Sequence, residues 1–406
     1  MDSQGSNREG EPVDLPVLDP AYKADPERLY ARLREQGRPV VRVRLPTGVE
    51  AWLVTGFDAA RAVLGDARMS KRAPAPAAAP AHSLFSHLLT LDPPQHTRLR
   101  SIVAREVSAR RIATLRPRIV ELAESLLDQA AASDPVDLMQ AYALPLPLRI
   151  ICGLVGVPVG DEALVIEWSR GLAAADLDDV SQVPAIAGQF HDYLSGLAAE
   201  QRDGPDDTVL GALARAERRG ELQAPEVAAL AYLVLMAGHE TTAHLIGNGV
   251  LALARDRSQW TRLCGNPELA PALVEELLRV ESPLEVATAR YATREITLEG
   301  RCIRPGDLVF ASLAAANRDP GRFARAAEID PGRESVASHL AFGHGIHFCA
   351  GAALARLEGE IALATLARRC PRLEIAMPFD MLEWLPGLIL RGLRSLPVHL
   401  DGRQAA

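Results

Sequence analysis

The chain has 406 residues, 48% of them hydrophobic, and a formal net charge of −8. This acidic balance argues against a nucleic-acid-binding surface. No run approaches the roughly 20 apolar residues that a membrane-spanning helix needs. The five cysteines are odd in number and scattered, which argues against a disulfide framework and suits a reducing compartment. We therefore expect a cytoplasmic protein that binds neither nucleic acid nor a membrane.

The N-terminal quarter contains a few distinct signals. Residues 1–14 are polar, lack the apolar stretch of a signal peptide and predict a disordered tail. Residues 39–46 and 50–56 are strand-like segments on either side of a turn and predict a β-hairpin. The prolines of residues 72–83 forbid a regular helix interior. That segment is either a surface loop or a mobile flap beside a ligand site.

Most of the remaining chain has the apolar spacing of helices, as in residues 271–281. One long helix is predicted to start at Pro225, a favoured first position, and to run to about Asp256. Its first half, residues 227–238, is apolar on every side and must be buried. The sequence GHETT follows in the middle of this helix, where burying Glu240 is costly unless the carboxylate is paired or used.

Residues 342–351 read FGHGIHFCAG and are followed by a helical pattern. Cys349 therefore lies at or just before a helix N-terminus, which should shift its thiol towards thiolate. The glycines permit tight turns and the close approach of a bulky group. Three alternatives follow for Cys349. It is a buried structural cysteine, a thiolate ligand to haem iron, or part of a zinc site with His344 and His347, for which His339 is a spare ligand. The loop by itself favours haem.

Four motifs together resemble the cytochrome P-450 superfamily. FGHGIHFCAG fills every defining position of its haem-binding signature, and AGHETT at 237–242 is similar to its oxygen-activating motif. Glu276 and Arg279 match its Glu-x-x-Arg pair, and LDPPQHTRLR at 91–100 resembles its haem-facing helix. The motifs occur in the family's order. The resemblance implies a mainly α fold with small β-sheets, the cytochrome P-450 fold, as a single triangular-prism-like domain over residues 15–406.

The resemblance also implies a cofactor, haem b (iron protoporphyrin IX), with Cys349 as its axial thiolate ligand. The residues that it assigns to the haem propionates are His96, Arg100, Arg290 and His347. Glu240 and Thr241 are implied to deliver protons during oxygen activation, and Gly238 to leave space for the oxygen.

By the same resemblance, Glu276 and Arg279 form a buried structural pair and not an ordinary surface ion pair. The family often adds a third arginine before the cysteine loop. Counting back along this chain leads to Glu328 or a neighbour instead, so Arg322 or Arg325 is the expected substitute.

The activity implied is that of a monooxygenase, which places one atom of O2 in an organic substrate by hydroxylation or epoxidation. Electrons would come from NAD(P)H through an acidic ferredoxin and a ferredoxin reductase, because no flavin or iron–sulfur segment is visible. The alternatives are a haem-thiolate peroxygenase and a non-catalytic haem sensor or carrier. The presence of Thr241 argues against the first, and the pair of Glu240 and Thr241 against the second. We expect a monomer.

Similarity to the actinobacterial branch that tailors macrolides and other polyketides implies a hydrophobic natural product as substrate. Family topology suggests six pocket-wall residues: Leu84, Phe85, Leu233, Ala237, Val286 and Ile389. Residues 98–118 contain seven arginines and one acid, Glu106. We expect the exposed ones among them, Arg105, Arg110 and Arg111, to dock the ferredoxin through complementary charge.

Overall fold

The computed structural model describes residues 11–74, 84–175, 180–204, 207–334 and 336–401. Most of the predicted loop or flap at 72–83 lies outside these residues, as do residues 1–10 of the predicted tail. Residues Val13–Asp14 form a β-strand, β1, so the ordered chain begins before residue 15, the boundary that we predicted. This short strand is held because it pairs in parallel with residues Val43 and Arg44.

Helices make up most of the described residues. Their bounds are α1 (Pro20–Ala24), α2 (Glu27–Glu35), α3 (Phe57–Gly65), α4 (Gln95–Glu106), α5 (Ala109–Ala113), α6 (Arg116–Ala130), α7 (Pro145–Val155), α8 (Glu162–Ala175), α9 (Val183–Gln201), α10 (Val209–Arg218), α11 (Ala224–Arg255), α12 (Arg257–Gly265), α13 (Ala270–Val280), α14 (Leu313–Asn317) and α15 (Ala352–Arg369). Among the described residues, none of these helices combines the length and the apolar run required to cross a membrane.

The strands are short and form three small sheets. Their bounds are β1 (Val13–Asp14), β2 (Val40–Arg44), β3 (Glu50–Val54), β4 (Met69–Ser70), β5 (Val136–Asp137), β6 (Arg290–Ala292), β7 (Ile296–Leu298), β8 (Arg301–Ile303), β9 (Leu308–Ala311), β10 (Glu374–Ile375) and β11 (Pro397–His399). The largest sheet has the order β1-β2-β3-β9-β6-β4, and the others are β10-β11-β5 and β7-β8. The structure is mainly α-helical with small β-sheets, which is the fold class that we predicted.

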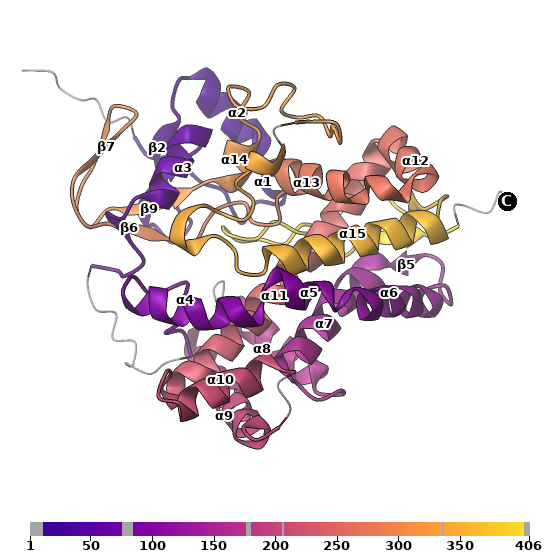
Figure 1. Ribbon diagram of the computed structural model, residues 1–406. Helices are drawn as coiled ribbons and strands as arrows, with labels where there is room; N and C mark the ends of the chain where they lie inside the picture. The colour runs from indigo at the N-terminus through magenta and orange to yellow at the C-terminus, as the bar shows by residue number, and fades with distance from the viewer. Residues whose placement is uncertain (1–10, 75–83, 176–179, 205–206, 335, 402–406) are drawn as a thin grey trace, which may run out of the picture.

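The predicted hairpin is confirmed, because β2 and β3 pair antiparallel with Arg42 opposite Trp52. β9 then joins β3 in parallel, which places Val309 beside Trp52. The indole of Trp52 donates to Asp307 at 2.8 Å, so the central strand β3 is tied to the turn before β9. In Figure 1 this sheet and helices α1 to α3 occupy the upper left, and the long helices fill the rest of the molecule.

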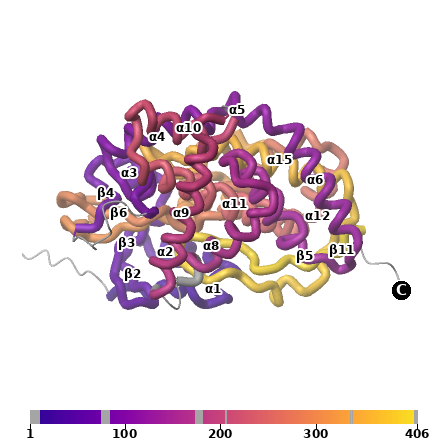
Figure 2. Tube along the Cα trace, turned by 90° about the horizontal axis from the view of Figure 1, so that it is seen from below, coloured from indigo at the N-terminus to yellow at the C-terminus, as the bar shows by residue number. Residues whose placement is uncertain are grey.

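Helix α11 is the centre of the helical part, and it packs against α7, α9, α10 and α15. Figure 2 shows α9 on the near side of α11 when the molecule is seen from below. The predicted helix is confirmed within one residue at each end. Its start is fixed by a capping box, in which Gln223 and Glu226 exchange hydrogen bonds between side chain and backbone. Its apolar first half is buried from Val227 to Leu233, as expected, and becomes more open towards Ala237.

Candidate active site

The Cys349 loop runs between α14 and α15 and ends directly before α15. Gly343 and Gly345 have φ of +73° and +75°, a backbone region that favours glycine. A Cβ at Gly345 would lie 2.8 Å from the carbonyl oxygen of Leu64 in α3, so only glycine fits there. The backbone N–H of Cys349 donates to the carbonyl of Phe342 at 2.9 Å. The loop therefore holds Cys349 in one position, and its side chain remains accessible to solvent.

The thiol of Cys349 lies in a recess, where burial raises its pKa. The N–H of Gly351 and the charges of Arg100 and Arg356 act in the opposite direction but do not outweigh burial. Our expectation that the helix N-terminus shifts this thiol towards thiolate is therefore wrong for the polypeptide by itself. Desolvation of the charged form is the stronger effect.

The zinc alternative finds no support in the loop. Both ring nitrogens of His339 are engaged, because one lies 3.2 Å from Glu275 and the other accepts from the N–H of Ala341 at 3.2 Å. His344 packs against Gly65 of α3 instead. Among the residues that the structure describes, no group of three or more His, Cys, Asp or Glu side chains is placed to hold a metal ion.

Three of the four predicted propionate ligands, His96, Arg290 and His347, form a cluster of basic residues in which burial lowers the pKa of both histidines and so favours their neutral form. The rings of His96 and His347 lie 4.4 Å apart, from centroid to centroid. The two ring nitrogens of His96 and the Nε of Arg290 have no hydrogen-bond partner among the described residues. Burial, followed by the charges of His96, Lys71 and Arg290, lowers the pKa of His347 to about 3. Buried donors without acceptors are costly, so this cluster fits an anionic ligand.

The fourth predicted propionate ligand is differently engaged. Arg100 is half-buried on α4 and donates through Nη2 to the carbonyl of Phe348 at 2.6 Å. It therefore ties α4 to the Cys349 loop, one turn along the helix from His96. Burial lowers the pKa of this guanidinium, and Cys349 partly restores it.

The middle of α11 changes from buried to open at the predicted oxygen-activating motif. Ala237 is exposed within an otherwise buried helix, and Glu240 and Thr241 are half-buried. The Thr241 hydroxyl donates to the carbonyl of Ala237 at 2.9 Å, which leaves its lone pairs free to accept. Gly238 does not serve the predicted purpose, because a Cβ there would lie 2.7 Å from Ile151 of α7. Its missing side chain permits close packing of the two helices.

Glu240 is the titratable group of this opening. Burial raises the pKa of its carboxyl, while His239 and Arg170 of α8 lower it. The neighbouring His239 is buried, and its Nδ1 lies 2.8 Å from the carbonyl of Leu235. His239 is thus engaged with its own helix, whereas Glu240 is half-buried at the opening.

A second cluster, around Glu276, holds the segment that precedes the Cys349 loop. Arg279 and Glu276 on α13 are fully buried and pair through two contacts of 2.7 and 2.9 Å. The third member of this network is a second arginine, Arg333, whose Nε lies 3.0 Å from the same carboxylate. Our expectation that Arg322 or Arg325 would substitute is therefore wrong. Arg322 lies over the ring of Phe57 at 5.3 Å, and Arg325 pairs with Glu328 and Asp330. The count back from Phe342 went past Arg333 to Glu328.

Comparison with known proteins gives a consistent result. The family model for cytochrome P-450 matches residues 189–375. The monooxygenase PikC of Streptomyces venezuelae is 42% identical over 99% of this chain and 98% of its own length. The chain belongs to the cytochrome P-450 family. The mycinamicin IV hydroxylase/epoxidase of Micromonospora griseorubida is 41% identical over 91% of this chain and 94% of its own.

The fold agrees with solved structures of the family. The bacillaene polyketide synthase cytochrome PksS of Bacillus subtilis superposes with a TM-score of 0.86 at 35% identity, covering 95% of this chain and all of that one. The protein is therefore a cytochrome P-450 monooxygenase, and the predicted fold class and enzyme class are confirmed. Members of this family bind haem through a cysteine thiolate.

The structure of this P-450 changes the predicted list of pocket walls. Three of the six residues keep solvent exposure, as a wall requires: Phe85, Ala237 and Ile389. Leu84 and Leu233 are buried at the edge of the main hydrophobic core. Val286 is fully buried in a separate core beside Tyr30 and Phe310, so its assignment as a wall is wrong. Successive side chains of an extended segment point to opposite faces, and Val286 points away.

The arginine-rich segment borders the thiol from the outside. A groove of ≈ 350 Å³ is lined by Arg100, Val107, Ala109, Cys349 and Arg356, among others, so α4 and α5 flank the access to the thiol. Four of the seven arginines form ion pairs: Arg98 with Glu226, Arg105 with Glu221, Arg111 with Glu106, and Arg116 with Glu360. The excess of positive charge is therefore smaller than the sequence count indicates.

The exposure of these arginines also differs from our expectation in one case. Arg105 and Arg110 are exposed, as predicted. Arg111 is half-buried between Glu106 and the carbonyl of Asp207, to which it donates at 2.6 Å. It is committed to the fold and is not available to a partner.

Two buried residues near the site were missed by sequence reasoning. Lys71 donates to the carbonyls of Thr288 and Ala289 at 2.9 and 3.0 Å, just before Arg290. Its scarcity was the available signal, since the chain has only one other lysine. Glu358 of α15 is fully buried with neither carboxylate oxygen hydrogen-bonded among the described residues. Burial raises the pKa of the Glu358 carboxyl well above its ordinary value.

Proposed function

We propose that this P-450 is a cytoplasmic monomer that inserts one atom of O2 into a macrolide- or polyketide-type natural product. The observation that carries the proposal is the opening at Ala237 and Thr241, an exposed patch in a buried apolar helix. The relatives support the substrate class, since one is named for mycinamicin IV and another for a polyketide pathway. The first name includes both hydroxylase and epoxidase, and either reaction fits this opening.

The chain's own residues would hold haem b from two sides. Cys349 would bind the iron, and a metal-bound thiol is deprotonated whatever its pKa in the free polypeptide. The unpartnered donors of His96 and Arg290, together with His347, would bind the two propionates. Arg100 would support the loop through Phe348 as well as the nearer propionate. Thiolate-bound haem iron supplies the activation of O2.

Glu240 and Thr241 would manage protons and water in the opening. The Thr241 hydroxyl already donates to Ala237, so it can accept a hydrogen bond from a water and hold that water beside the substrate. Burial favours the protonated form of Glu240, so its carboxyl can release a proton and be recharged from the α8 side, where Arg170 lies. The two side chains are consecutive on α11, and a proton can pass from one to the other through one water.

Electrons would come from NAD(P)H through a ferredoxin reductase and an acidic ferredoxin. The groove beside Cys349 supports a docking site there, because α4 and α5, which flank it, also carry the exposed Arg105 and Arg110. Exposed charges steer the encounter and contribute less to final affinity.

The test is a panel of macrolides, linear polyketides and non-polyketide controls added to the ferric holoprotein. A substrate displaces the water on the iron and shifts the absorption spectrum, and mass spectrometry then identifies a product with one added oxygen atom. Thr241→Ala should keep the spectral shift but divert NAD(P)H to hydrogen peroxide, while Thr114→Ala, on the exposed end of α5, should behave as the wild type. A panel in which only non-polyketides shift the spectrum would contradict the substrate class.

A further inference from the structure

Lys71 lies where three segments of the chain meet. It directly follows β4, and it is one of only two lysines in the sequence. β4 pairs antiparallel with β6, with Ser70 opposite Tyr291, and β6 begins at Arg290. The third segment leads into α4, which carries His96. Lys71 therefore lies between two parts of the expected haem site that are far apart in the sequence.

The ammonium group of Lys71 fixes the segment that leads into β6. Its Nζ donates to the carbonyl oxygens of Thr288 and Ala289 at 2.9 and 3.0 Å, and it also donates to the Thr288 hydroxyl. An ammonium has three N–H donors, so all of them are engaged within the protein. The side chain therefore acts on the backbone directly before Arg290.

The backbone of Lys71 is held by the segment that precedes α4. Its N–H donates to one carboxylate oxygen of Asp92 at 2.9 Å, and the Ser70 hydroxyl donates to the other oxygen. The carbonyl of Asp92 in turn accepts from the N–H of His96 at 3.0 Å, in the first turn of α4. Hydrogen bonds therefore connect the start of α4 to the start of β6 through Lys71.

The charges of this region work against its assembly. Burial, together with the charge of Arg290, lowers the pKa of Lys71 to about 7, and burial lowers the pKa of Arg290 to about 10. The carboxylate of Asp92 opposes the shift of the pKa in both. Neighbouring positive groups repel each other, so Arg290 stays in place only if its backbone is held.

We propose that Lys71 is a positioning residue for haem, which holds the backbone before Arg290 against the start of α4 so that Arg290 and His96 face the same propionates. This inference rests on the proposed assignment of those two residues to the propionates. Lys71 does not bind the haem itself, because its three donors are engaged. A site that is ordered in advance binds its ligand at a lower entropy cost.

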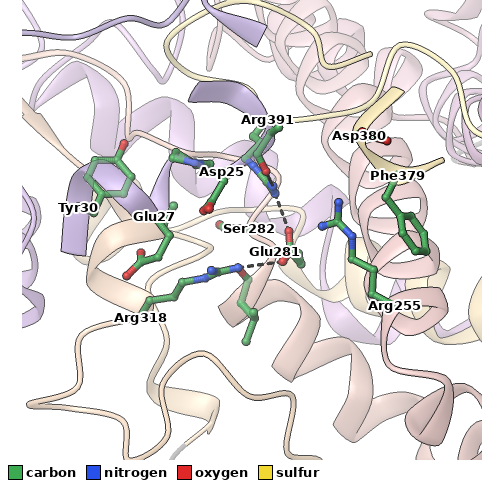
Figure 3. Close-up of a pocket in the computed structure, with 14 residues that line it drawn as sticks. Asp25, Glu27, Tyr30, Arg255, Glu281, Ser282, Arg318, Phe379, Asp380 and Arg391 are labelled. Atoms are coloured by element: carbon green, nitrogen blue, oxygen red, sulfur yellow. Dashed lines mark hydrogen bonds and ion pairs between the residues drawn. The ribbon is translucent and has the colours of Figure 1, made fainter. Parts of the chain in front are cut away.

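A basic residue with similar contacts elsewhere provides a matched control. Arg318 lines a cavity of ≈ 470 Å³ that none of the predicted haem residues borders. Its guanidinium contacts Glu281 at 2.8 Å (Figure 3) and donates to the carbonyl of Val280 at 2.9 Å. Arg391 contacts the other oxygen of Glu281 at 2.6 Å, so this carboxylate keeps a partner when Arg318 is replaced. Loss of Arg318 should therefore lower stability without affecting haem.

The test is the transfer of haem from the ferric holoprotein to apomyoglobin, recorded together with the melting temperature of each variant. Lys71→Met should release haem about tenfold faster than the wild type, because Arg290 loses its alignment with a propionate. Arg318→Met should melt at a lower temperature and release haem at the wild-type rate. An unchanged rate in Lys71→Met, or an equal acceleration in Arg318→Met, would overturn the inference. A wild type that takes up no haem would instead contradict the proposed function.

A double-mutant cycle shows whether Lys71 acts through Arg290. In an Arg290→Met background, Lys71→Met should change the rate of haem loss by less than about twofold, because the residue that it positions is already absent. Effects that multiply would mean that Lys71 acts on haem independently and would refute the positioning role. Thr288→Val removes one of the three contacts of Lys71 and tests the same link if Lys71→Met does not fold. It should release haem a few-fold faster, and a wild-type rate would count against the proposal.

Discussion

Two clusters of basic residues in this P-450, one around Glu276 and one around His96, differ in how their hydrogen bonds are satisfied. In the Glu276 cluster, Arg279 donates to Glu276 and to the carbonyls of Asn317, Ala326 and Glu328. In the His96 cluster, the ring nitrogens of His96 and the Nε of Arg290 have no partner among the described residues. Both clusters remove polar groups from water, but only the Glu276 cluster is compensated within the polypeptide.

This difference separates a structural role from a binding role. A buried charge is tolerated when it is paired and hydrogen-bonded, and it is destabilising when it is not. The Glu276 cluster is complete without a ligand, so its energy goes into holding the segment before the Cys349 loop. The His96 cluster needs acceptors from outside the chain, and the propionates of haem are acceptors of the required charge.

The largest effect is expected at Cys349, the predicted ligand of the haem iron. Cys349→His should abolish the absorption band of the reduced carbon monoxide complex, near ~450 nm for a thiolate ligand, together with turnover. The measurement is a difference spectrum of the reduced protein. Cys264→Ser, a half-buried cysteine of α12, is the control and should keep the band. A Cys349→His protein with the full band would refute the assignment of the ligand.

The complete cluster can be broken by a single atom. Glu276→Gln leaves Arg279 and Arg333 without a negative partner, and we expect a loss of about 3–5 kcal/mol in the free energy of unfolding. Glu328→Gln, whose exposed side chain pairs only with Arg325, should cost under about 1 kcal/mol. Chemical denaturation followed by circular dichroism measures both. Equal losses in the two variants would show that burial of the cluster does not matter.

The incomplete cluster should respond in the opposite way. Arg290→Met removes a buried guanidinium whose Nε has no hydrogen-bond partner among the described residues, so the haem-free protein should be at least as stable as the wild type. The holoprotein should lose haem to apomyoglobin about 10–100 times faster, since a charge-assisted bond to a propionate is worth about 1.5–3 kcal/mol. Arg294→Met, exposed and near the same strand, is the control. A haem-free variant that is clearly destabilised would assign Arg290 a structural role.

The smallest effect is expected at the exposed arginines, which neither cluster holds. Reversal of Arg105 and Arg110 to Glu should slow reduction by an acidic ferredoxin a few-fold at low salt and flatten its salt dependence. Stopped-flow reduction measures the rate. Arg28→Glu on α2 has a side chain that is 87% exposed and should leave the rate unchanged. An unchanged salt slope after the double reversal would place the docking face elsewhere.

The two lysines show how a rare residue can carry information. Both are buried, and each donates three hydrogen bonds: Lys23 to Glu285 and the carbonyls of Gly387 and Leu390, and Lys71 to both oxygens of Thr288 and the carbonyl of Ala289. A compact ammonium satisfies three convergent acceptors that the planar guanidinium of arginine would not fit. In a chain so rich in arginine, this scarcity was a signal that the sequence contained and that composition analysis passed over.

The parts that the sequence alone determined are local in the chain. The β2–β3 hairpin and the bounds of α11 follow from spacing, turn chemistry and capping among neighbouring residues. The Cys349 loop and the Glu276–Arg279 pair are also local motifs, but their roles followed from the resemblance to the family and not from spacing alone. The tertiary structure decided the rest. Arg333 pairs with Glu276 from 57 residues away, and Val286 is buried in the core beside Tyr30 and not in a pocket wall. Burial raises the pKa of Cys349, which is opposite to the shift that we expected from the helix N-terminus. Desolvation and long-range pairing depend on what surrounds a residue in space, and no periodicity along the chain encodes that environment.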